Sequence, residues 1–191
     1  MKKDIILAGV GGQGILTIAT IIGDAAASHG LNLKQAEVHG MSQRGGDVQS
    51  NLRLSTETIH SDLIRQGTAD LIISMEPMEA LRYCQCLNAE GWVVTSSNPF
   101  KNIANYPDED CLMAELKALP NVVALPIEEL ARENGMPKCA NIMLLGMAAR
   151  NIGILTPEQL RESISRVFAT KGEAVVEMNL KAFDMGMEIV K

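Results

Sequence analysis

A glycine-rich turn near the amino terminus constrains the fold of this chain more than any other segment. It follows the apolar run Ile5–Ala8 and precedes a longer apolar run, Ile15–Ile22. The first run has the length of a buried parallel strand, and the second keeps apolar side chains over more than two helical turns. A tight strand-to-helix turn is therefore predicted at Gly9, Gly11, Gly12, Gln13 and Gly14.

A turn of this kind is a candidate phosphate-binding site. Glycine lets an anion approach the backbone closely, and the free N–H groups at the start of the next helix point toward it. The spacing Gly-x-Gly-x-x-Gly is a weak signal alone, and the strand and helix around it strengthen the signal. A turn that only joins the strand to the helix is the alternative, and the sequence leaves both open.

Composition limits the class of protein. Of the 191 residues, 47 % are apolar, which is enough to bury the core of one domain spanning residues 1–191. Aromatic residues make up only 3 %, so aliphatic side chains and eleven methionines fill that core, as suits helices layered on a parallel sheet. The net charge of −6 and the lack of a basic run argue against nucleic-acid binding.

The cysteines and the apolar runs indicate a cytoplasmic protein. No Cys-x-x-Cys pair exists among the four cysteines, so neither a zinc site nor an iron–sulfur site is expected, and we expect reduced thiols. The three histidines show no metal-ligand spacing either. No stretch approaches the ~20 apolar residues that span a membrane, so no membrane association is expected.

The order of the apolar runs predicts the fold class. Runs at Ala69–Met75, Gly91–Thr95 and Asn121–Leu125 read as further parallel strands. Residues 48–55 alternate instead, which indicates a half-exposed antiparallel strand, with Thr58–Ser61 as a candidate hairpin partner. Helical patterns fill the last third. We therefore expect a three-layer α/β/α sandwich with a mainly parallel sheet, an antiparallel hairpin insertion and a helical C-terminal third.

Two segments together carry a family resemblance. The turn at Gly9–Gly14 and the segment Glu37–Gly46 resemble the gamma-type domain of the 2-oxoacid:ferredoxin oxidoreductases, most closely the beta subunit of the indolepyruvate branch. Ala69–Pro77 and Asn141–Gly146 also lie where this family has recurring segments. The resemblance covers nearly the whole chain, and Glu37–Gly46 is its most specific part.

The resemblance implies a role in a larger enzyme. Such enzymes oxidatively decarboxylate a 2-oxoacid with coenzyme A and reduce ferredoxin, using thiamine diphosphate, Mg²⁺ and [4Fe–4S] clusters. This chain has neither the Gly-Asp-Gly thiamine motif nor cluster cysteines, so those cofactors are expected on a larger alpha subunit. The subunit alone is expected to be inactive, to bind no cofactor tightly, and to have coenzyme A as its candidate ligand at Gly9–Gly14.

The resemblance also suggests a loop that faces the substrate or the partner subunit. Within this loop, Arg44 is the best candidate for a functional polar side chain. Its guanidinium could hold a carboxylate or phosphate through two hydrogen bonds, or form an ion pair across the subunit interface. No residue of this chain is predicted to be catalytic. His39 either contacts the substrate or only forms hydrogen bonds with backbone groups. The loop residues concerned are His39, Ser42, Gln43, Arg44, Gly45 and Gly46.

Two acidic residues and two other function classes remain open. Glu37 lies near the position of a ribose-binding acid, which would suit a nicotinamide- or flavin-dependent enzyme, but no helix is expected after it. A strand-end acid that caps the next loop is the alternative. Glu76 ends a strand and is expected to cap the following helix. A nucleotide-binding module without chemistry is the second alternative function.

Overall fold

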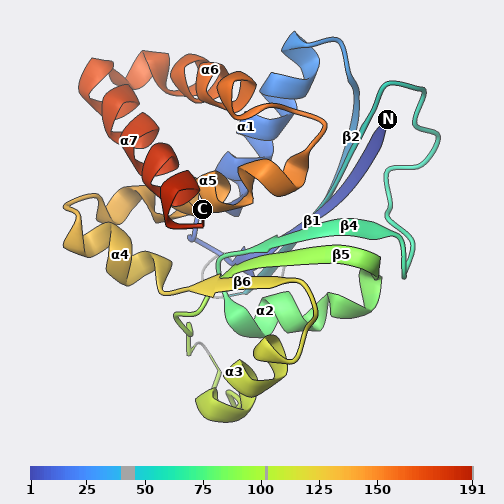
Figure 1. The fold of residues 1–191 in the computed structure, drawn as a ribbon, viewed down its shortest axis with the longest axis vertical. Coiled ribbons are helices and arrows are strands. Elements are labelled where there is room, and N and C mark those ends of the chain that lie inside the picture. Colours follow the sequence, from blue (N-terminus) through green and yellow to red (C-terminus); the bar gives the residue numbers. More distant parts are fainter. Residues whose placement is uncertain (40–45, 102, 191) are drawn as a thin grey trace.

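The computed structural model describes residues 1–39, 46–101 and 103–190, and a six-stranded sheet lies at its centre (Figure 1). Its strands are β1 (Lys2–Val10), β2 (Asn32–His39), β3 (Asp47–Ser55), β4 (Ala69–Ser74), β5 (Leu87–Ser96) and β6 (Val122–Leu125). They are arranged in the order β2-β3-β1-β4-β5-β6. β1, β4, β5 and β6 run parallel, whereas β3 is antiparallel to both β1 and β2. The mainly parallel sheet with an antiparallel insertion is confirmed.

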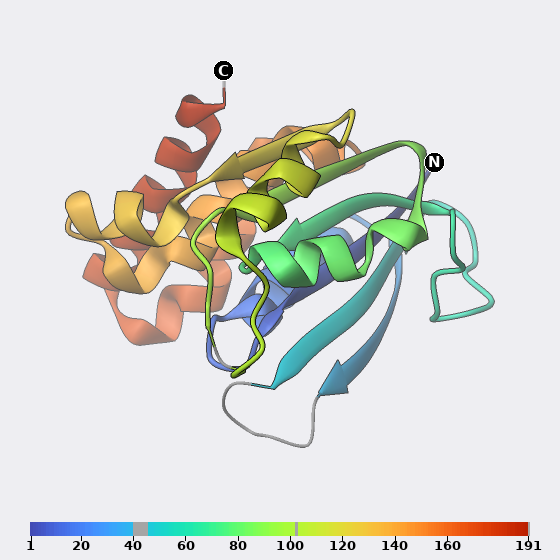
Figure 2. The same ribbon diagram turned by 90° about the horizontal axis from the view of Figure 1, so that it is seen from below.

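Helices cover both faces of the sheet. Among the described residues these are α1 (Ile15–Ser28), α2 (Pro77–Arg82), α3 (Glu109–Lys117), α4 (Ile127–Glu133), α5 (Ala140–Ile152), α6 (Pro157–Phe168) and α7 (Glu173–Ile189). α1, α5, α6 and α7 lie on one face, and α2 and α3 lie on the other (Figures 1 and 2). The three layers and the helical C-terminal third are as predicted. None of the described helices has both the length and the apolar character needed to cross a membrane.

β1 is buried because it lies inside the sheet with helices on both faces. Its side chains alternate between the faces, so Ile5 and Leu7 join the larger core with α1 and α5, while Ile6 joins a smaller core on the α2 side. Residues 4–10 are all buried. This burial on both sides explains why the strand reads as a continuous apolar run.

The hairpin partner of β3 differs from the prediction. Residues 58–61 are irregular, and β3 pairs instead with β2, which precedes it, so that Leu33 lies opposite Leu54. The alternating pattern identified an antiparallel strand, but β3 is not half-exposed as predicted: only one of its nine residues is exposed, and it lies between β2 and β1. The pattern carries no information about which neighbour the strand pairs with. Figure 2 shows that β2 and β3 extend beyond α2 and α3, the helices on the face of the sheet seen in that view.

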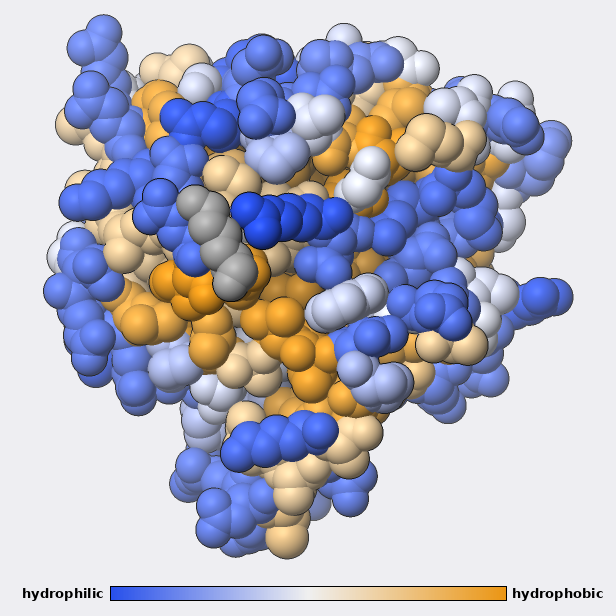
Figure 3. All heavy atoms as spheres, viewed as in Figure 1, coloured by the Kyte–Doolittle hydropathy of each residue, from blue (hydrophilic) through white to orange (hydrophobic). Residues whose placement is uncertain are grey.

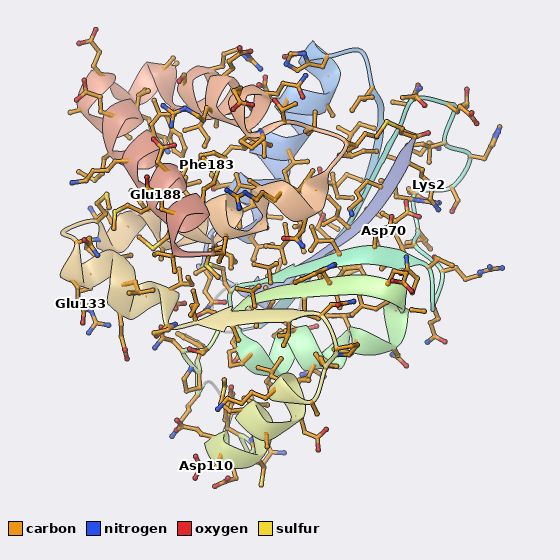
Figure 4. All side chains as sticks on the ribbon, viewed as in Figure 1. Lys2, Asp70, Asp110, Glu133, Phe183 and Glu188 are labelled. Atoms are coloured by element: carbon orange, nitrogen blue, oxygen red, sulfur yellow. The ribbon has the colours of Figure 1, made fainter. Side chains whose placement is uncertain are left out.

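α5 and α7 touch backbone to backbone at two glycines. A Cβ atom added at Gly146 would lie 2.1 Å from the carbonyl oxygen of Phe183, and one added at Gly186 would lie 2.0 Å from that of Met143. Phe183 itself is fully buried between these helices and the core (Figure 4). Any side chain larger than hydrogen at either glycine would therefore push the two helices apart.

An ion pair holds the opposite end of the sheet together. The Asp4 carboxylate is fully buried and accepts hydrogen bonds from Arg53, at 2.8 Å from Nε and 3.1 Å from Nη2. Lys2 Nζ lies 2.8 Å from the same carboxylate. Arg53 Nη1 also donates to the carbonyl oxygens of Ser61 and Leu63. The pair thus fixes the irregular segment after β3 to β1, at the end of the sheet where Lys2 lies in Figure 4.

Candidate functional site

The glycine-rich segment forms the predicted turn between β1 and α1. Gly12 and Gly14 adopt φ angles of 103° and 80°, which only glycine reaches without strain. Gly14 is the N-cap residue of α1, and neither a side-chain cap nor an acidic residue occupies the first helical turn. A Cβ atom added at Gly12 would meet no atom within 4 Å, so this face of the turn opens into space. An uncapped helix start of this kind can bind an anion, although the Gly11 and Gln13 N–H groups of the turn already donate to the carbonyl oxygens of Gly46 and Val10.

Gln13 holds the turn in place. Its Oε1 accepts a hydrogen bond of 2.7 Å from the Val10 N–H, and its Nε2 donates to the carbonyl oxygen of Met75 at 3.2 Å. The side chain therefore joins the end of β1 to the residue that follows β4. Its amide oxygen and one of its two amide N–H donors are thus used inside the protein, so Gln13 supports the turn.

Asn141, at the start of α5, is a second support that the sequence pattern did not reveal. Its Nδ2 donates to the carbonyl oxygen of Gly14 at 3.1 Å, across 127 residues of sequence. A Cβ atom at Gly14 would lie only 2.5 Å from this nitrogen, so the contact also requires glycine there. One signal was present, since Asn141 opens a segment that recurs in the family that the chain resembles, but nothing assigned the residue to the turn.

Two clefts border the turn, and both are lined by Gly12, Gln13, Lys138 and Asn141. The first, here called the α4 cleft, has a volume of about 700 Å³ and extends to the segment after β5 and to α4. The second, here called the α7 cleft, has a volume of about 510 Å³ and extends to the start of α7. The turn lies where the two clefts meet, so a ligand longer than one cleft can cross it.

The two clefts differ in charge. The α7 cleft is lined by Lys138 and Lys171, and no carboxylate is among its described lining residues. In the α4 cleft, Arg132 and Lys138 are accompanied by Glu128 and Glu129. The α7 cleft therefore suits an anion, in a chain whose net charge is −6.

Glu128 is a partly buried residue of the α4 cleft wall. Burial raises the pKa of its carboxyl group, and the hydrogen bond that it accepts from the Ser96 hydroxyl acts in the opposite direction. Ser96 is the last residue of β5, so Glu128 fixes the start of α4 against the carboxyl end of the sheet. The carboxyl groups of Glu128 and Glu129 make the α4 cleft less favourable for an anion than the α7 cleft.

The loop after β2 begins and ends beside the turn. β2 includes His39, and the carbonyl oxygen of Gly46 accepts a hydrogen bond of 2.9 Å from the Gly11 N–H. The predictions for Ser42, Gln43, Arg44 and Gly45 lie outside the described residues. Of the described ends, Gly46 contacts the turn, and His39 is paired with Val48 at the same end of β3.

The two acidic residues considered in the sequence, Glu76 and Glu37, lie in different environments. Glu76 caps α2 as predicted, because its Oε2 accepts the Glu79 N–H at 2.8 Å. Glu37 lies exposed on the edge strand β2, 2.5 Å from Gln35 Nε2. The element after Glu37 is the antiparallel strand β3 and not a helix. That arrangement differs from a dinucleotide-binding unit, in which a ribose-binding acid ends a strand followed by a helix.

The described residues offer no further cofactor site. No group of three or more His, Cys, Asp or Glu side chains among them is placed to hold a metal ion. All four cysteines are free, and of these Cys139 is buried beside the turn as part of the α7 cleft. Burial raises the pKa of the Cys139 thiol, which keeps it protonated and unreactive.

Comparisons with known proteins agree on one family. Residues 4–189 match the family described as "Pyruvate ferredoxin/flavodoxin oxidoreductase". The indolepyruvate oxidoreductase subunit IorB of Archaeoglobus fulgidus is 36 % identical, over 97 % of this chain and 94 % of its own length.

Solved structures share the fold. The gamma subunit of a keto/oxoacid ferredoxin oxidoreductase from Geobacter sulfurreducens matches with a TM-score of 0.70 at 25 % identity, covering 98 % of both chains. A 2-oxoglutarate:ferredoxin oxidoreductase from Magnetococcus marinus matches with a TM-score of 0.76 at 24 % identity. That match covers 99 % of this chain but 31 % of the other, so this fold also occurs as part of a longer chain.

Proposed function

Because the chain belongs to the pyruvate ferredoxin/flavodoxin oxidoreductase family, we propose that it is the small subunit of a 2-oxoacid:ferredoxin oxidoreductase. The complete enzyme converts a 2-oxoacid and coenzyme A into an acyl-CoA and carbon dioxide and reduces ferredoxin. One observation carries the proposal for this chain: its glycine turn opens between two clefts that contain Lys138 and Lys171. Such a site suits an anionic ligand.

The proposed substrate is indolepyruvate or another arylpyruvate. Its support is the 36 % identity to an indolepyruvate oxidoreductase subunit over nearly the full length of both chains. The proposed partner is a larger alpha subunit that carries thiamine diphosphate, Mg²⁺ and [4Fe–4S] clusters, with ferredoxin reached through the complex. Its support is that this sequence has neither Cys-x-x-Cys spacing nor a Gly-Asp-Gly motif.

Coenzyme A is the proposed ligand of the turn, and the residues present fit it. Coenzyme A supplies the thiol that accepts the acyl group, and it carries several phosphates. The open backbone at Gly12, the uncapped start of α1 and the lysines of the α7 cleft would bind those phosphates. This chain would thus orient the acceptor, while the loop from His39 to Gly46, with Arg44 in it, faces the partner.

The proposed function is tested by assembly. We expect the chain purified alone to be colourless and inactive with every 2-oxoacid, and to gain activity when a large iron–sulfur protein from the same cell is added. The measurements are a pull-down with the tagged chain, the visible absorbance of what it retains, and indolepyruvate-dependent reduction of ferredoxin. Stoichiometric iron in the isolated chain, or activity without a partner, would contradict the assignment.

A substitution at Gly12 tests the coenzyme A site. Gly12→Ala places a methyl group in the open space over the turn, and we expect the KM for coenzyme A in the reconstituted enzyme to rise about 10-fold or more, as for loss of about 1.4 kcal/mol of binding. Gly30→Ala is the matched control, because Gly30 also has a positive φ and no atom within 4 Å, but lies just after the other end of α1. Equal effects of both variants would show backbone strain alone, and an unchanged KM in Gly12→Ala would make the turn purely structural.

A further inference from the structure

The two oxygens of the buried Glu76 carboxylate bind two different elements. Glu76 is fully buried at the end of β4. Its Oε2 caps α2, whereas its Oε1 accepts hydrogen bonds from the Phe100 N–H at 3.3 Å and from the Tyr106 hydroxyl. Capping a helix requires only one oxygen. The second oxygen therefore attaches the described part of the segment between β5 and α3 to the centre of the sheet.

The segment held in this way forms a wall of the α4 cleft. Asn98 and Phe100 line that cleft together with Gly12, and 44 % of the Phe100 surface is exposed. On the other side, the Asn98 amide accepts from the Glu128 N–H at 3.2 Å and donates to Glu129 Oε1 at 3.1 Å. The wall is thus attached at two points, to α4 through Asn98 and to β4 through Glu76.

Tyr106 completes the second attachment without touching the cleft. It lies beside a different hollow, whose lining includes Pro107 and Asp108. Burial and the neighbouring Glu76 both raise the pKa of the Tyr106 phenol, so it stays protonated and donates at physiological pH. A buried carboxylate needs such donors, because each missing one leaves charge without compensation.

We propose that Tyr106 is a positioning residue for the ligand site: through Glu76, its hydroxyl fixes the Phe100 backbone and with it the wall that faces Gly12. The inference rests on the proposed function, since the ligand is taken to be coenzyme A. Without the hydroxyl, the wall keeps its attachment through Asn98 and the hydrogen bond from the Phe100 N–H, but Glu76 Oε1 loses its second donor and holds Phe100 less firmly. A ligand must then order the wall when it binds, which lowers affinity without altering the chemical step.

The test is Tyr106→Phe in the reconstituted enzyme, a change that removes one oxygen atom and leaves the ring. We expect hydrogen exchange at the Phe100 amide to become about 10-fold faster, as for loss of about 1.4 kcal/mol from a hydrogen-bonded network. The KM for coenzyme A is expected to rise roughly 3- to 10-fold while kcat is kept. Tyr83→Phe is the matched control, because Tyr83 lies at the C-cap of α2 and lines neither cleft.

Each result decides the inference. Unchanged exchange at Phe100 overturns it, as does faster exchange with an unchanged KM when Gly12→Ala does raise the KM. A fall in kcat equal to the rise in KM would also overturn it, since positioning of a wall predicts a binding effect. If Gly12→Ala leaves the KM unchanged, the coenzyme A site is wrong, and faster exchange at Phe100 alone then supports the attachment through Tyr106.

Discussion

Gly146→Ala is expected to lower the free energy of unfolding by about 3 kcal/mol or more, at the upper end of what overpacking costs. The added methyl carbon would lie 2.1 Å from a main-chain oxygen of α7, so no side-chain rotation can relieve the clash. α5 and α7 would have to separate, although alanine is intrinsically the better helix former by about 1 kcal/mol. Urea unfolding followed by circular dichroism measures the change, and Gly186→Ala should behave alike.

Gly23→Ala is the matched control for this prediction. Gly23 also lies inside a helix, α1, but its added Cβ atom would approach only the end of the Leu33 side chain, at 3.2 Å. A flexible side chain can move by a few tenths of an ångström, so this variant should change the unfolding free energy by less than about 1 kcal/mol in either direction. A loss as large as that of Gly146→Ala would show that backbone contact between α5 and α7 is not the cause.

Arg53→Met is the second substitution with a large expected effect. It leaves the fully buried Asp4 with Lys2 as its remaining charged partner and removes the contacts to Ser61 and Leu63. Removing one partner of a buried ion pair costs about 3–5 kcal/mol, and retention of Lys2 places the expected loss near about 3 kcal/mol. Thermal and urea unfolding measure it, and limited proteolysis should cut the segment at residues 56–68 more rapidly.

Two further variants separate burial from charge. Adding Asp4→Asn to Arg53→Met removes the uncompensated buried charge, so part of the lost stability should return. Arg166→Met breaks an exposed ion pair with Asp24, of 2.8 Å, and should cost less than about 1 kcal/mol. If Arg53→Met costs no more than Arg166→Met, the buried pair contributes nothing special and the prediction is wrong.

The elements that sequence patterns predicted are those whose cause is local. Burial of β1 on both faces produces the continuous apolar run at Ile5–Ala8, and the positive φ angles of Gly12 and Gly14 require the glycines that mark the turn. The wrong hairpin partner, residues 58–61, has a non-local cause. A strand's alternation specifies which side is buried, whereas its neighbour depends on contacts with the whole sheet.

The candidate site likewise combines residues that are close in the sequence with residues that are distant in it. Gly9–Gly14 was visible because its six residues are consecutive, although Gly9 and Val10 are the last residues of β1 and only residues 11–14 form the turn. Lys138, Asn141 and Lys171 were not recognised as parts of the site, because they reach it from the end of the chain through helix packing. No spacing rule connects residues that are more than 120 positions apart. Glu76 was recognised as a cap, but its second contact depends on Tyr106, 30 residues later.

The hydrogen bond between Asn141 and Gly14 has a consequence for synthesis of the chain. Its partners are 127 residues apart, so at about 5–20 residues per second roughly 6–25 s pass between their synthesis on the ribosome. During that time the first strand, turn and helix can form, but both clefts lack Asn141 and the α7 cleft also lacks its residues from Phe168 onward. A nascent or prematurely terminated chain that lacks α5 and α7 should therefore retain the turn yet bind no ligand there. Only a chain translated past Asn179, in α7, can complete the α7 cleft.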